Sequence, residues 1–132
     1  MSRLIPAVAR ATIITLDDEA DILDLMNTVL RRAGFEVHGA CSFDELSMYL
    51  NDMRCDAIVL DIRISDGHDG FWIAETLRGR GIQIPIIFVT AFDAPATRLR
   101  ASLIPHSHFL LKPFDPQELI DSILLAIRVT VL

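Results

Sequence analysis

The sequence predicts one α/β domain, a doubly wound (βα)5 unit in which helices cover both faces of a five-stranded parallel sheet. Short apolar runs alternate with longer stretches of helical spacing, a pattern typical of strand-helix units around a buried sheet. The 132 residues can bury one substantial core but not two. A hydrophobic fraction of 52% and a charged fraction of 23% indicate a packed globular protein.

Five apolar runs are the predicted strands. In chain order they cover residues 11–16, 35–40, 57–60, 84–89 and 108–111. Residues 1–10 precede the first run, so we expect an N-terminal extension followed by one domain over residues 11–132.

Apolar spacing, capping pairs and prolines predict five helices between and after the strands. The first helix has apolar residues three and four positions apart: Ile22, Met26, Val29, Leu30 and Ala33. It ends at Gly34, a residue type that favours the left-handed conformation found after many helices. Two pairs with capping-box spacing begin the second and fifth helices: Ser42 with Glu45, and Asp115 with Glu118. The third helix is expected over 71–80 and the fourth over 94–103, where Pro105 prevents continuation.

Several apolar side chains are predicted to be buried. The stripe of the fifth helix is predicted to be core, with a dimer face open for part of it: Leu119, Ile120, Ile123, Leu124 and Ile127. Phe71 and Trp72 are predicted to be buried in the third helix. Cys41 and Cys55 fit neither a disulfide framework nor a zinc spacing, and are predicted to be reduced and partly buried.

Composition argues against several classes of function. The formal net charge is −6 and no run of Lys or Arg is long enough to neutralise many phosphates, so direct nucleic-acid binding is not expected. Charge or proline interrupts the apolar runs well before about 18 residues, so no membrane-spanning helix is expected. No charged and then apolar leader opens the chain, and we expect a cytoplasmic protein.

Polar side chains follow the strands of the predicted sheet. In an open α/β sheet, ligands bind beyond the carboxyl ends of the strands. The residues at those ends are Asp17, Asp18 and Glu19 after the first strand, Asp61 after the third, Thr90 after the fourth and Lys112 after the fifth. Carboxylates, a hydroxyl and an ammonium are therefore expected to meet at one edge.

These residue types suit a magnesium site that handles a phosphoryl group. Like-charged carboxylates in a poorly solvated place repel, and a divalent cation relieves that repulsion. Mg²⁺ is usually held by one or two carboxylates plus a phosphate. Lys112 would add positive charge and Thr90 a hydroxyl donor. Taken singly, each residue has an ordinary alternative, such as a helix-dipole acid, a turn Asp, an N-cap Thr or a surface Lys, but their joint placement favours the site.

Over residues 12–127 the chain resembles the receiver domain of two-component response regulators, of the chemotaxis-regulator type. The matching motifs are Leu16-Asp17-Asp18-Glu19, Ile58-Val59-Leu60-Asp61, Val89-Thr90-Ala91 and Leu111-Lys112-Pro113-Phe114. The resemblance implies a flavodoxin-like sheet in the strand order 2-1-3-4-5. It also implies a signalling switch that phosphorylates and slowly dephosphorylates itself, rather than a turnover enzyme.

By the same resemblance, Asp61 is the nucleophile that takes a phosphoryl group from a phosphohistidine on a histidine kinase or phosphotransfer protein. Mg²⁺ would be bound by Asp18, Asp61 and the backbone carbonyl of Arg63, with Asp17 acting largely through water. Lys112 would contact the phosphoryl group. The protein would contribute positioning and charge neutralisation.

The resemblance also implies a switch. Thr90 would move to the phosphoryl group, and Phe109, three residues before Lys112, would turn into the vacated space. A static core Phe is the alternative. The turned ring would alter the face made by the fourth helix, fifth strand and fifth helix, where a downstream protein or an output domain outside this chain would bind. The Lys112-Pro113 bond is expected to be cis.

The sequence departs from the family pattern beside the acceptor. The loop 62–70 lacks the usual proline and carries Gly70 one position late, so we expect greater mobility there. Arg63 and Phe92 stand where the family tunes the access of water, and neither is a carboxylate or an amide. We therefore expect a comparatively long-lived phosphorylated state.

Other interpretations remain open at this point. A small Mg²⁺-dependent phosphohydrolase also uses an Asp nucleophile, but its two aspartates are two residues apart, whereas Asp17 is followed directly by Asp18. A degenerate receiver that acts by protein binding alone is the other alternative. His106 and His108 invite a metal interpretation, although solvated loop histidines are the better hypothesis. The sequence fits a stand-alone regulator or one piece of a longer protein.

Overall fold

The computed structural model of the chain describes residues 11–63 and 69–131, with side chains up to Ile127. The predicted N-terminal extension (1–10) and most of the loop after the third strand (64–68) lie outside the described residues, so neither expectation is tested.

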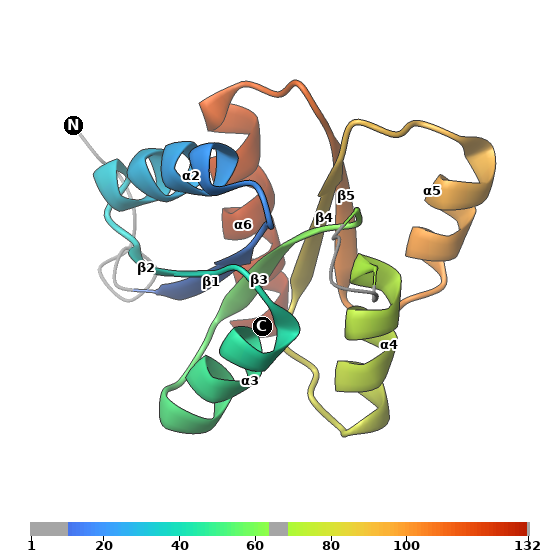
Figure 1. Ribbon diagram of the computed structural model, residues 1–132, viewed down its shortest axis with the longest axis horizontal. Helices are drawn as coiled ribbons and strands as arrows, with labels where there is room; N and C mark the ends of the chain where they lie inside the picture. The colour runs from blue at the N-terminus through green and yellow to red at the C-terminus, as the bar shows by residue number, and fades with distance from the viewer. Residues whose placement is uncertain (1–10, 64–68, 132) are drawn as a thin grey trace.

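Five strands form one parallel sheet in the order β2-β1-β3-β4-β5, which confirms the predicted topology (Figure 1). They are β1 (Thr12–Leu16), β2 (Glu36–Ala40), β3 (Ala57–Asp61), β4 (Ile86–Thr90) and β5 (Ser107–Leu111). The helices are α2 (Ala20–Arg32), α3 (Phe43–Asp52), α4 (Gly70–Gly79), α5 (Pro95–Ser102) and α6 (Pro116–Val131). Within the described part of the chain, no helix has the length and apolarity needed to cross a bilayer.

Two apolar layers enclose the sheet, one on each face. Helices α2 and α6 pack on one face, and α3, α4 and α5 pack on the other (Figure 1). The predicted stripe of α6 lies in the first layer, where Leu119, Ile123 and Ile127 are buried and Ile120 and Leu124 are partly buried. The core interpretation of this stripe is therefore confirmed.

Strand ends differ slightly from the sequence prediction. The fourth strand begins at Ile86 rather than at 84, because Pro85 has no N–H to donate to a neighbouring strand. Asp61 and Thr90 are the last residues of β3 and β4, rather than the first residues after them. Both side chains therefore have the rigidity of the sheet.

Two burial predictions were wrong in part. Phe71 is buried, but Trp72 is 36% exposed, because α4 turns it away from the sheet and against the edge of Phe43, with 5.2 Å between ring centroids. Cys41 is exposed at the end of β2, whereas Cys55 is buried. Burial raises the pKa of the Cys55 thiol to about 12, so it stays protonated.

Polar contacts fix the start of α3 and the placement of α2. Ser42 accepts a hydrogen bond from the N–H of Glu45 at 3.2 Å, as the capping pattern predicted. In the core, the Thr15 hydroxyl on β1 donates to the Asn27 side-chain oxygen on α2 at 2.6 Å. Gly39 on β2 leaves room for this pair, because a Cβ there would lie 2.5 Å from the Asn27 amide nitrogen.

Candidate functional site

The order of the strands brings two aspartates together at the carboxyl edge of the sheet. Leu16 pairs with Leu60 across β1 and β3, so Asp17 and Asp61 are the next residues in register on adjoining strands. Both aspartates are buried. Asp18 follows as a half-buried residue. The predicted acidic edge is therefore present in the structure.

Lys112 bridges the two aspartates. Its Nζ lies 3.2 Å from Oδ2 of Asp17 and 3.1 Å from Oδ2 of Asp61. The other oxygen of each carboxylate accepts a backbone N–H two residues further on, from Glu19 at 2.9 Å and from Arg63 at 3.0 Å. These contacts fix the orientation of both carboxylates.

Burial sets the protonation of the site. Burial raises the pKa of Asp61 most, and the Asp17 charge raises it further. The Arg63 N–H and Lys112 lower it, and the result is a pKa of about 6 instead of 3.8. For Lys112, burial lowers the pKa, but Asp61 and Asp17 together raise it more, so the ammonium stays charged.

The raised pKa of Asp61 predicts a pH-dependent stability for the metal-free protein. The folded state binds a proton on Asp61 more readily than the unfolded state does, so stability falls as pH rises through the range from 3.8 to about 6. Asp61→Asn removes this penalty and should raise the free energy of unfolding by about 1–3 kcal/mol at about pH 7.5.

Urea unfolding in EDTA measures this gain. The difference between Asp61→Asn and the wild type should shrink towards zero at about pH 3, where Asp61 is mostly protonated in both states. Asp52→Asn, at an exposed position on α3, is the control and should show no such change. A difference in the free energy of unfolding that does not change with pH would contradict the assignment of this penalty to ionised Asp61.

Thr90, Arg63 and Phe92 lie around the end of β4. Thr90 is buried, and its hydroxyl accepts the N–H of Phe92 at 3.1 Å. The Arg63 guanidinium lies over the Phe92 ring, 5.4 Å from its centroid, which links the loops after β3 and β4. Phe109 on β5 is partly buried and packs against the layer under α3, α4 and α5.

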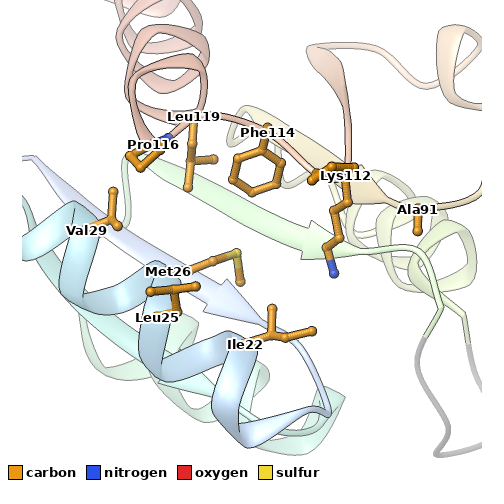
Figure 2. A pocket seen from close by; sticks show the side chains of 10 residues that line it. Ile22, Leu25, Met26, Val29, Ala91, Lys112, Phe114, Pro116 and Leu119 are labelled. Atoms are coloured by element: carbon orange, nitrogen blue, oxygen red, sulfur yellow. The ribbon is translucent and has the colours of Figure 1, made fainter.

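An apolar pocket adjoins the site between α2 and the start of α6. It has a volume of about 460 Å³. Figure 2 shows residues of α2 facing residues of the loop before α6 and of α6 itself, with Lys112 at one end. The lining residues are Ile22, Leu25, Met26, Val29, Ala91, Lys112, Pro113, Phe114, Pro116 and Leu119. The Lys112-Pro113 bond in its wall is cis, as expected.

The oxygen donors of the site fit Mg²⁺. Two buried carboxylates converge on one ammonium, which leaves an excess of negative charge. Among the described residues, no three His, Cys, Asp or Glu side chains form a ready metal cage. Mg²⁺ needs only one or two carboxylates and completes its shell with water, carbonyl and phosphate oxygens, so this donor set suits it.

Gly70 has a role that sequence reasoning missed. A Cβ at this position would lie 2.4 Å from the Asp61 carbonyl oxygen and 2.8 Å from the Cα of Ile62. The Gly70 N–H also donates to the Ile62 carbonyl at 2.8 Å. The sequence singled out Gly70 only as the family's loop glycine, one position late, which does not reveal what the backbone touches.

Fold and site together define a class of protein. A sheet in the order 2-1-3-4-5 with this carboxylate–lysine edge is that of a receiver domain. Residues 13–124 match the family described as "Response regulator receiver domain", and the chain belongs to this family. It is thus a receiver domain of two-component signalling.

Relatives of known name agree with this assignment. The transcriptional regulatory protein GltR of Pseudomonas aeruginosa is 31% identical over 119 residues, which cover 89% of this chain and 49% of GltR. The response regulator TodT of Pseudomonas putida is 30% identical, over 90% of this chain and 52% of TodT. The chain therefore spans about half the length of these relatives.

Solved structures share the fold. The receiver domain of the Francisella response regulator 1452 has a TM-score of 0.84 at 24% identity, over 92% of this chain and 99% of that one. TrrA of Thermotoga maritima, in complex with Mg(2+)-BeF, has a TM-score of 0.76 at 25% identity, over 88% of this chain and 98% of that one.

Proposed function

We propose that this receiver domain accepts a phosphoryl group on Asp61, with Mg²⁺, and thereby changes a protein-binding face. The observation that carries the proposal is the placement of the buried Asp61 carboxylate between Lys112 and the Arg63 N–H, beside Asp17. A fixed nucleophile with one nearby cation needs little else for phosphoryl transfer, which depends mainly on positioning and charge.

The transfer would proceed from a phosphohistidine on a kinase or phosphotransfer protein. A carboxylate oxygen of Asp61 forms the new bond to phosphorus. The phosphorus–nitrogen bond breaks, and the donor imidazole leaves with the bonding pair and takes a proton from solvent. Lys112 stays beside Asp17 and Asp61 and neutralises a phosphoryl oxygen.

Asp17, Asp18, Asp61 and the carbonyl of Arg63 would hold Mg²⁺ in this site. When bound, the ion supplies positive charge against the carboxylates and the phosphoryl oxygens. Thr90 would exchange its contact with the Phe92 N–H for a bond to the phosphoryl group. Phe109 would then turn inward and reshape the face of α5, β5 and α6, where a downstream protein, an output domain or a second copy would bind.

Intact-protein mass spectrometry tests the proposal. Incubation with acetyl phosphate or a phosphoramidate and Mg²⁺ should add one phosphate to the wild type and none to Asp61→Asn. Omission of Mg²⁺ should abolish the addition. Steady turnover of a phosphomonoester would instead favour a phosphohydrolase, and no added mass under any condition would favour a receiver that acts without phosphorylation.

Arg63 and Phe92 should prolong the phosphorylated state, because their contact joins the loops that follow Asp61 and Thr90 and would hinder the approach of water between them. Arg63→Ala should shorten the half-life of the phosphorylated protein several-fold. Arg80→Ala is the matched control, since Arg80 lies 5.6 Å from the Phe43 ring at a distance from the site. A wild-type half-life of seconds, measured by loss of the added mass, would contradict this prediction.

The pocket beside Lys112 would receive the phosphoryl donor protein. A donor that reaches Asp61 must cover this edge, and the pocket continues from Lys112 along α2 (Figure 2). Leu25→Asp should slow transfer from the phosphorylated kinase about tenfold or more, since hot spots of an interface contribute about 2 kcal/mol or more. Transfer from acetyl phosphate should not change. Met48→Asp, exposed on α3 over the other face, is the control.

A further inference from the structure

Helix α5 has few apolar contacts with the rest of the domain. Its only buried residue is Ala101, and Leu99 on the same helix is 62% exposed. Two arginines of this helix also contact aromatic rings. The guanidinium groups of Arg98 and Arg100 each lie 4.7 Å from a ring centroid, over Phe109 and Phe71 respectively.

Arg98 is held in place by a second contact. Its Nε donates to the carboxylate of Asp93, with which it also forms an ion pair. Asp93 lies in the loop after β4, three residues beyond Thr90. Arg98 therefore connects the loop that follows Thr90 to the ring of Phe109.

We infer that Arg98 is a positioning residue that holds Phe109 in its unphosphorylated placement, and that Asp93 holds Arg98 over the ring. The inference rests on the proposed function and names a regulator of the same site. Phe109 has no polar group that could form a hydrogen bond. The cation–π contact of its ring with the Arg98 guanidinium is therefore the polar interaction that holds it in place. Arg100 instead lies over Phe71 and forms an ion pair with Glu75, both of which are on α4.

The energetics give Arg98 a direct influence on the acceptor. Inward rotation of Phe109 separates the ring from the guanidinium and forfeits their attraction. Any interaction that opposes the inward placement also weakens binding of the phosphoryl group, by up to the same factor, because the two equilibria are linked. A movement of Thr90 towards Asp61 would also shift the loop that carries Asp93. This shift would weaken the ion pair of Asp93 with Arg98 and so the contact of Arg98 with Phe109.

Fluorine NMR of the full chain with 4-fluorophenylalanine at position 109 tests the inference. Spectra are recorded with Mg²⁺, with and without beryllofluoride as the phosphoryl mimic. In the free Arg98→Gln protein, the resonance should move towards its position in the beryllofluoride-bound wild type. The variant should bind beryllofluoride about two- to fivefold more tightly, the factor expected for a partly exposed cation–π contact. Arg98→Lys, which keeps the cation, should restore part of both changes.

Arg100→Gln is the matched control on the same helix and should leave the Phe109 resonance and the affinity unchanged. Equal resonance and affinity in Arg98→Gln and wild type would overturn the inference, as would an identical response in Arg100→Gln, which would indicate general loosening of α5. A wild type that does not respond to beryllofluoride would instead overturn the proposed function. The two failures are thus distinguishable.

Discussion

Gly70→Ala is expected to lower the free energy of unfolding by about 1–3 kcal/mol, the usual range for overpacking. The new Cβ would lie 2.4 Å from the Asp61 carbonyl oxygen and 2.8 Å from the Cα of Ile62, and both atoms belong to the backbone. No side-chain rotation relieves such a contact, so β3 or α4 must shift. Phosphorylation of Asp61 should fall as well, because the displaced strand end carries the acceptor.

Urea unfolding and the mass assay together measure this result. Gly79→Ala, at the other end of α4, is the control, because its Cβ would meet nothing within 4 Å. It should stabilise the protein by up to about 1 kcal/mol, since Ala favours a helix over Gly. If Gly70→Ala were as stable and as active as Gly79→Ala, the close approach of α4 to Asp61 would be wrong.

Lys112→Met should lower the free energy of unfolding of the metal-free protein by about 2–4 kcal/mol at about pH 7.5. The substitution leaves Asp17 and Asp61 buried side by side without the ammonium that both contact. Lys112 lowers the pKa of Asp61, so this pKa is higher in the variant than the value of about 6 in the wild type. Protonation of Asp61 relieves the repulsion, and the loss should therefore shrink as pH falls towards about 6.

Two comparisons separate this electrostatic cause from lost packing. The double variant Lys112→Met with Asp61→Asn should recover most of the stability, because one negative charge is gone. Added Mg²⁺ should stabilise Lys112→Met more than it stabilises the wild type, if the ion occupies the same edge. A loss that is independent of pH and not rescued by Asp61→Asn would point to packing of the lysine stem instead.

The fold and the acidic edge could be predicted from sequence because both follow from short-range patterns. The run Ile58-Val59-Leu60 predicts a buried strand, and its end places Asp61 at the carboxyl edge of the sheet. The strand order then brings Asp17 beside it without any detail of side-chain packing. The Mg²⁺ and phosphoryl roles of these residues remain predictions.

Features that depend on side-chain direction could not be predicted. Phe71 and Trp72 were both expected to be buried, but neighbouring residues on a helix point about 100° apart, and here only Phe71 faces the sheet. The contact of Arg98 on α5 with Phe109 on β5 depends on the rotamers of both side chains, which the sequence does not specify. The sequence alone does not predict that an arginine on a helix lies over an aromatic ring.

The hydrogen bond between Thr15 and Asn27 determines more than its own free energy. Apolar contacts are not directional, so a helix packed on a sheet could slide or rotate slightly at little cost in free energy. A buried hydrogen bond is directional and is formed in only one relative orientation of the helix and the strand. This bond links β1, which ends beside Asp17, to the helix that begins two residues after Asp18. The positions of Asp17 and Asp18 are therefore set by a contact within the core, independently of any bound ion or phosphoryl group.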